Sequence, residues 1–172
     1  MNPDHRATIE RTPEGGIIRF DRQLAYPIDE VWSALTEPER LADWWTPFDT
    51  TISVDVREGG FLAFDWPGHD VPRFEFTILR CEPPRLLEHT HTGPGSWLRW
   101  ELEPTATGTR LRATYFVPEP DMAIERGDVV GAHYGLDRLA AALAGRPVPV
   151  DMAAFAALQA EYAEHGLAAP HG

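Results

Sequence analysis

A long central part of the chain alternates apolar and polar residues. Between residues 50 and 117 the alternation runs through about six short segments. A period of two is typical of strands that bury one face, and the segments are separated by turn signals such as Gly59-Gly60 and Pro83-Pro84. This pattern predicts an antiparallel meander, with a bulge where Leu79 and Cys81 change the parity before Pro83. The alternating sets are Ile52, Val54, Val56; Leu62, Phe64, Trp66; Phe74, Phe76, Ile78; Leu87, His89, His91; Leu98, Trp100, Leu102; and Leu111, Ala113, Tyr115.

A sheet with one apolar face needs a second layer, and the only large helical segment follows it. After Pro120, with Asp121 as a candidate cap, residues recur at intervals of four, three, four and three, and Gly145 ends the pattern. A further amphipathic helix is predicted from Asp151 to about His165. The stripe of the long helix comprises Val129, His133, Leu136, Ala140 and Leu143.

The residues before the meander predict one strand and two short helices. Residues 1–16 form a polar lead-in, which we expect to be mobile or to extend an edge, and a strand follows over about 17–26. Asp29 is positioned to cap the first short helix. Thr36 and Glu39 have the spacing of a capping box, which would open the second helix.

This order of elements indicates an α+β fold in a single domain. With 172 residues, of which 43% are hydrophobic, the chain is long enough to bury one real core. We expect a curved antiparallel sheet of about six to seven strands wrapped around the long helix. The domain spans 17–145, and residues 146–172 form a C-terminal helical extension packed on it.

Charge and cysteine content limit the partners and the compartment. The 15 basic residues, all arginine, face 27 acidic ones, and the net charge of −12 argues against nucleic acid or an anionic membrane as partner. Arginine without lysine is typical of a GC-rich bacterial genome. The single Cys81 cannot form an internal disulfide, and there is no apolar signal segment or membrane-length run. These observations predict a reduced, cytoplasmic protein.

Several motifs resemble the SRPBCC/START-like superfamily, and within it the proteins similar to the activator of heat-shock protein 90 ATPase homologue. The resemblance covers about 17–145 and implies a helix-grip fold with a cavity between the sheet and the long helix. The motifs are Val31-Trp32-Ser33-Ala34-Leu35-Thr36-Glu37-Pro38-Glu39-Arg40-Leu41-Ala42-Asp43-Trp44-Trp45, Val56-Arg57-Glu58-Gly59-Gly60, Glu82-Pro83-Pro84-Arg85, Gly108-Thr109-Arg110-Leu111, Gly131, Leu136-Asp137-Arg138-Leu139 and Leu143-Ala144-Gly145.

Three functions are compatible with that resemblance, because a fold does not fix one chemistry. The first is binding of a small lipophilic or aromatic ligand. The second is an enzyme of the aromatase/cyclase-like type, and the third is a co-chaperone-like interaction module. No nucleophile elbow, catalytic triad or phosphate loop is present in the sequence, and we predict no cofactor.

Three histidines are the candidate catalytic residues. His89 and His91 lie on one strand face, about 7 Å apart, and His133 lies on the helix stripe that faces it. Imidazoles that converge on one cavity could act as general acid and base or bind zinc. The alternative is that they are partly buried rings hydrogen-bonded to each other, to the backbone or to a ligand. A metal is not predicted, because no acidic fourth ligand occupies a matching position.

Aromatic side chains dominate the predicted cavity lining, which suits a planar or lipophilic ligand. Trp44 and Trp45 either pack in the core or form a lid edge, and we expect one of each. On the opposite, convex face, Trp97 needs cover from a homodimer contact or from the C-terminal helix. The predicted ligand-binding residues are Trp45, Phe64, Trp66, Phe74, Phe76, His89, His91, Trp100, Tyr115, His133 and Leu136.

Overall fold

The fold is built on one curved antiparallel sheet. The computed structural model describes residues 5–46 and 49–167. Within them the sheet has eight strands in the order β1-β2-β8-β7-β6-β5-β4-β3. The strands are β1 (Thr8–Thr12), β2 (Gly15–Leu24), β3 (Thr51–Asp55), β4 (Phe61–Asp65), β5 (Phe74–Glu82), β6 (Leu86–Thr90), β7 (Trp97–Thr105) and β8 (Gly108–Val117). The helices are α1 (Ile28–Thr36), α2 (Pro38–Ala42), α3 (Pro120–Arg126), α4 (Asp128–Leu143) and α5 (Met152–His165).

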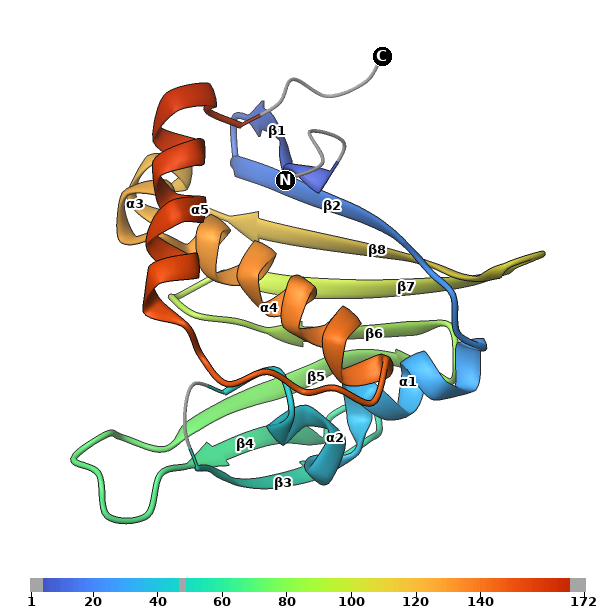
Figure 1. Ribbon diagram of the computed structural model, residues 1–172. Helices are drawn as coiled ribbons and strands as arrows, with labels where there is room; N and C mark the ends of the chain where they lie inside the picture. Colours follow the sequence, from blue (N-terminus) through green and yellow to red (C-terminus); the bar gives the residue numbers. More distant parts are fainter. Residues whose placement is uncertain (1–4, 47–48, 168–172) are drawn as a thin grey trace.

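The long helix α4 crosses the concave face of the sheet, as Figure 1 shows. Strand β2 pairs with β8, so the second strand of the chain lies beside the last one. The turn-separated segments from β3 to β8 follow one another as neighbours, which is the meander predicted from the period of two. The expected helix-grip architecture is confirmed. Among the described residues, no helix combines the length and the apolar character needed to cross a bilayer.

The register of β7 decides which face of the sheet forms the core, because a slip of one residue would turn every side chain over. Trp100 is 4% exposed and lies on the α4 side, as predicted. Trp97 lies on the convex face, where its ring stacks on Phe116 at 5.5 Å and the Arg99 guanidinium lies 4.9 Å from its centre. Side chains of its own sheet therefore cover Trp97 in part. The C-terminal helix α5 packs against α4 instead.

The sheet has one strand more than expected. Strand β1 falls within the predicted polar lead-in and extends the edge by pairing with β2, which begins at Gly15. The predicted bulge is present as a register shift between Ile78 and Arg80. Residues 1–4 of the lead-in and residues 168–172 of the C-terminal extension lie outside the described residues.

Both caps predicted for the two short helices before the meander are wrong. The hydroxyl of Thr36 donates to the carbonyl of Trp32 at 2.8 Å, so it completes α1 rather than opening α2. Glu37 is the residue before α2, and it makes no side-chain cap. Asp29 lies within the first turn of α1, where its charge still favours the helix N-terminus.

The C-terminal helical region is divided differently from the prediction. Gly127 adopts a left-handed conformation, with φ of 84°, and separates α3 from α4. Asp121 lies in the first turn of α3 and is not its cap. Asp151 does cap α5, because its carboxylate accepts from the backbone N–H groups of Ala153 and Ala154.

Candidate functional site

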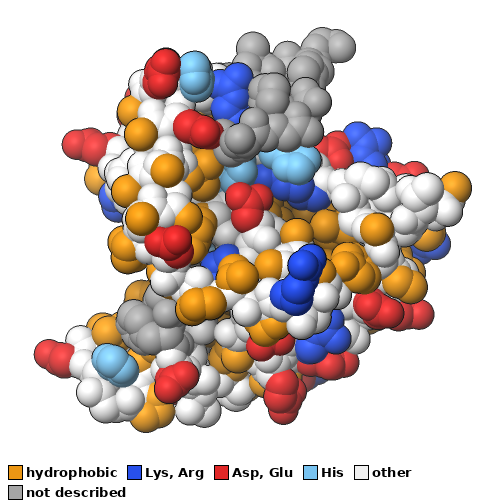
Figure 2. All heavy atoms as spheres, viewed as in Figure 1, with side chains coloured by type: hydrophobic (Ala, Val, Ile, Leu, Met, Phe, Trp, Pro, Cys, Tyr) orange, Lys and Arg blue, Asp and Glu red, His pale blue; other side chains and the backbone are white. Residues whose placement is uncertain are grey.

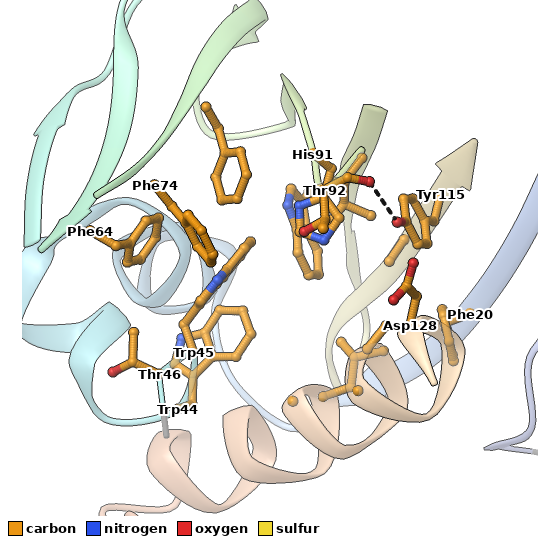
Figure 3. Close-up of a pocket in the computed structure, with 18 of the residues that line it drawn as sticks. Phe20, Trp44, Trp45, Thr46, Phe64, Phe74, His91, Thr92, Tyr115 and Asp128 are labelled. Carbon is orange, nitrogen blue, oxygen red and sulfur yellow. Dashed lines mark hydrogen bonds between the residues drawn. The ribbon is translucent and has the colours of Figure 1, made fainter. Parts of the chain in front are cut away.

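A pocket of about 320 Å³ lies between the concave face of the sheet and α4. The sheet contributes large aromatic side chains, and the segment that follows α2 closes one side, as Figure 3 shows. Pockets of this size accept small organic ligands. The lining consists of Phe20, Trp44, Trp45, Thr46, Phe64, Trp66, Phe74, Phe76, His91, Thr92, Leu98, Trp100, Ala113, Tyr115, Asp128, Gly131, Ala132, Gly135 and Leu136.

Two glycines on α4 leave room for this pocket. Gly131 and Gly135 are spaced one turn apart and both line it. A Cβ atom at Gly131 would meet no atom of a neighbouring element within 4 Å. At Gly135 the nearest atoms are ring carbons of Trp44, at 3.8 and 3.9 Å. Neither glycine projects a side chain into the pocket, so the space beside these two positions remains open.

The wall opposite these glycines is a connected group of aromatic rings. Trp45 stacks on Phe64 with ring centres 5.7 Å apart and planes inclined by 21°. The Trp45 ring also contacts Trp44 at 5.0 Å and Trp100 at 5.9 Å. Trp44 is itself buried, and its indole N–H donates to the carbonyl of Ala34 in α1 at 2.9 Å. Both tryptophans thus line the pocket, and Trp44 also belongs to the core.

A buried arginine fixes the segment that carries these tryptophans. The Nη1 atom of Arg138 donates to the carbonyl oxygens of Trp44 and Thr46, at 2.7 and 2.9 Å. Its Nε atom donates to the carbonyl of Val148 at 3.1 Å. Arg138 is only 6% exposed, and burial lowers the pKa of its guanidinium. Three carbonyl dipoles stabilise this charge while it joins α4 to the edge of the pocket.

The other end of the pocket is polar. His91, Thr92, Tyr115 and Asp128 lie there, and Figure 3 shows Tyr115 and Asp128 pointing toward each other. The Tyr115 hydroxyl donates to the carbonyl of Thr92 over 3.4 Å. Burial, followed by the charge of Asp128, raises the pKa of Tyr115, so its proton stays in place. Burial and the neighbouring His89 lower the pKa of His91 to about 3, which keeps this imidazole neutral near pH 7.

His89 lies behind the pocket wall rather than in the lining, contrary to the prediction. Its Nε2 accepts from the indole N–H of Trp100 at 3.1 Å, and its Nδ1 donates to the carbonyl of Thr90 at 2.7 Å. Both ring nitrogens are therefore engaged, and the side chain is fully buried. Burial lowers the pKa of His89 to about 4. These bonds hold the His89 ring against Trp100 and the backbone of β6.

His133 does not meet the other two histidines, which corrects the prediction that all three converge. It lines a separate hollow of about 360 Å³, where α4 packs against α5. Its Nδ1 accepts from the Tyr162 hydroxyl at 2.8 Å, and its Nε2 lies 3.6 Å from a carboxylate oxygen of Asp137. Burial, and then the charge of Arg22, lowers the pKa of His133 to about 4. In Figure 2, histidine, basic and acidic side chains gather between α5 and β2, where this hollow lies.

The remaining candidate residues line the pocket, and several lining residues were not predicted. Across residues 5–46 and 49–167 no group of three metal-ligating side chains is placed to hold an ion. The sequence analysis missed Thr46, Thr92, Asp128, Gly131 and Gly135 as lining residues. The two glycines had a readable signal, because their spacing of four marks a face without side chains within a helical pattern. The predicted residues that line the pocket are Trp45, Phe64, Trp66, Phe74, Phe76, His91, Trp100, Tyr115 and Leu136.

The sheet, the crossing helix and the pocket between them define a protein of the helix-grip class. A family model, described as Activator of Hsp90 ATPase homolog 1-like protein, matches residues 25–144. The chain belongs to this family. No curated protein sequence matches it.

Solved structures show the same architecture. CalU16 from Micromonospora echinospora is 30% identical, with a TM-score of 0.66, over 92% of this chain and 94% of that one. Protein NE0264 from Nitrosomonas europaea is 27% identical, with a TM-score of 0.64, over 78% of this chain and 97% of that one. EF2215 from Enterococcus faecalis, at 19% identity and a TM-score of 0.74, covers 92% of this chain and 88% of its own and shares the fold.

Proposed function

We propose that this protein binds a small apolar aromatic molecule in the pocket between α4 and the sheet. The observation that carries the proposal is the pairing of an aromatic wall, centred on Trp45 and Phe64, with the open stretch of helix at Gly131 and Gly135. A flat ligand can lie between these two surfaces and make ring contacts on one side without displacing a helix side chain. Membership of a family with the helix-grip fold is consistent with such a site.

The geometry supports binding over acid–base catalysis by the histidines. Of the three candidates, only His91 lines the pocket, and its pKa of about 3 makes it a weak base and leaves it without an acidic proton to donate near pH 7. His89 and His133 have their Nδ1 or Nε2 atoms engaged outside the pocket. The description of the family refers to an ATPase activator, but no feature of this pocket supports a co-chaperone role.

The first experiment is native mass spectrometry of freshly purified protein, followed by calorimetric titration with 1-methoxynaphthalene as a probe. We expect a retained molecule of defined mass, or one-to-one binding of the probe. Gly131→Leu should fill the open space and weaken probe binding at least about tenfold. The matched control is Ala140→Leu, which places the same side chain on an exposed part of α4.

Two outcomes would contradict the proposal. One is the absence of both a retained molecule and probe binding by the parent protein. The other is equal weakening of binding by Gly131→Leu and Ala140→Leu, because binding would then not depend on the pocket. A circular dichroism spectrum of each variant, matched to the parent, ensures that the comparison is made between folded proteins.

A further inference from the structure

The polar end of the pocket presents hydrogen-bond acceptors to a ligand. Asp128 contributes a carboxylate, and its side chain is 17% exposed. The Tyr115 hydroxyl donates its proton to the carbonyl of Thr92. That proton is therefore already used within the protein. The Nδ1 atom of His91 is shielded from solvent and has no hydrogen-bond partner within the described residues. A ligand that reaches this end gains most by bringing a donor.

Negative charge on the ligand is disfavoured at this end. The cation at this end, Arg126, is already paired with Asp128 at 2.8 Å, so an anionic ligand would have to compete with that carboxylate for it. The other cation beside the pocket, Arg138, directs its donors to backbone carbonyls at the opposite side. A carboxylate ligand would therefore lose its hydration without gaining a positive partner.

Positive charge is disfavoured as well. The pocket keeps His91 neutral because burial penalises its protonated form. The same desolvation acts on a ligand ammonium group placed beside it. Arg126 also neutralises the charge of Asp128, so the carboxylate offers an incoming cation little net attraction. The polar end is therefore suited to a group that donates a hydrogen bond and carries no charge.

We infer that the ligand is a neutral hydroxylated aromatic, whose ring lies against Trp45 and Phe64 and whose hydroxyl donates at the His91–Asp128 end. This inference rests on the proposed function, since it specifies the ligand class of the same pocket. In this inference the hydroxyl donates to Nδ1 of His91, a residue of the lining, whose Nδ1 lacks a partner among the described residues. The neutral imidazole then holds its proton on Nε2. A phenol meets both requirements, because its ring and its donor lie in one rigid plane.

Calorimetry with two probes of nearly equal size tests this inference. The parent protein should bind 1-naphthol about tenfold more tightly than 1-methoxynaphthalene, which is about what one hydrogen bond contributes. His91→Phe should reduce this ratio to about one, whereas His91→Gln, which restores a polar acceptor, should recover part of it. The matched control, His165→Phe, changes an exposed histidine at the end of α5 and should leave the ratio unchanged.

The outcomes separate this inference from the function on which it rests. If the parent binds both probes equally well, the hydroxyl inference is overturned while binding of an aromatic ligand stands. If neither probe binds, both are overturned. Tighter binding of 1-naphthoate or of 1-naphthylmethylammonium than of 1-naphthol would also overturn the inference, because the polar end would then prefer a charge.

Discussion

The hydroxyl of Tyr162 joins α5 to α4 by donating to Nδ1 of His133 over 2.8 Å. The same oxygen accepts from the backbone N–H of Ala7 at 2.9 Å, just before β1. One phenol therefore connects three segments that are far apart in the sequence. It also fixes the tautomer of His133, since an Nδ1 atom that accepts leaves the proton on Nε2.

Removal of that hydroxyl should destabilise the fold. Tyr162→Phe keeps the ring but leaves Nδ1 of His133 and the N–H of Ala7 without their partner, at an expected cost of about 1 to 3 kcal/mol in the free energy of unfolding. Urea unfolding measures this cost. In the control, Tyr134→Phe, the lost hydroxyl bonds to Asp151 at an exposed position, so a smaller effect is expected. Equal effects for the two variants would show that burial of the Tyr162 network contributes nothing.

Trp100 should be among the most sensitive positions of the sheet. Trp100→Ala removes a large buried side chain and the donor to His89, and we expect a loss of about 3 to 5 kcal/mol. Trp97→Ala, three positions earlier on the convex face, is the control and should cost clearly less. Guanidinium denaturation midpoints report both losses. A midpoint of Trp100→Ala within error of the parent would contradict the buried assignment.

The buried guanidinium of Arg138 should stabilise the pocket edge. Arg138→Met retains much of the side-chain volume but leaves the carbonyls of Trp44 and Thr46 without donors. The expected cost is about 1.5 to 3 kcal/mol, the range for hydrogen bonds to a charged group. Arg146→Met removes an exposed arginine just after α4 and should be nearly neutral. Thermal or urea unfolding of the two variants gives the comparison, and similar stability of both would refute this role.

Stability should fall on acidification, because His89 and His91 resist protonation in the folded state. Burial lowers their pKa values to about 4 and about 3, whereas a histidine in the unfolded chain titrates near about 6.5. As the pH falls from about 6.5 to about 4, the unfolded state takes up protons that the native state excludes, and the free energy of unfolding decreases. Above about pH 7 both states are neutral and this dependence disappears.

Each of these histidines contributes a slope of up to about 1.4 kcal/mol per pH unit. Urea unfolding of the parent between about pH 5 and pH 7.5 measures the combined slope. His91→Phe should make it shallower by up to that amount, while His165→Phe, at an exposed site, should not change it. A slope unaffected by His91→Phe would mean that this imidazole titrates normally in the folded protein.

The alternation of residues was sufficient to predict the fold and most of the aromatic wall. In a strand, parity alone assigns each side chain to one face, so Trp100 and Tyr115 were placed correctly on the helix side. Parity does not tell whether a side chain on that face reaches the pocket or lies behind other side chains. For that reason His89 was predicted to line the pocket, although Trp100 covers its Nε2 atom. Whether one side chain covers another depends on the register between neighbouring strands, and the sequence of a single strand does not reveal that register.

For residues in helices, the sequence pattern did not identify which neighbour each side chain contacts. The stripe on α4 is wide enough to face both the sheet and α5, and its spacing does not tell which partner His133 meets. Thr36 has the residue type and spacing of a cap, but the carbonyl of Trp32 in its own helix is within reach. Arg138 could not be identified as a buried anchor, because its acceptors are backbone carbonyls that leave no trace in the side-chain pattern.

The distribution of indoles gives the protein an optical property. Of the six tryptophans in the chain, Trp44, Trp45, Trp66 and Trp100 line the pocket, whereas Trp97 stacks on Phe116 at the convex surface. Indole emission shifts in wavelength and intensity when nearby water is displaced or when another ring comes into contact. Entry of a ligand would therefore change the intrinsic fluorescence of the unlabelled protein. With most of its fluorophores around one pocket, the chain can report occupancy of that pocket directly.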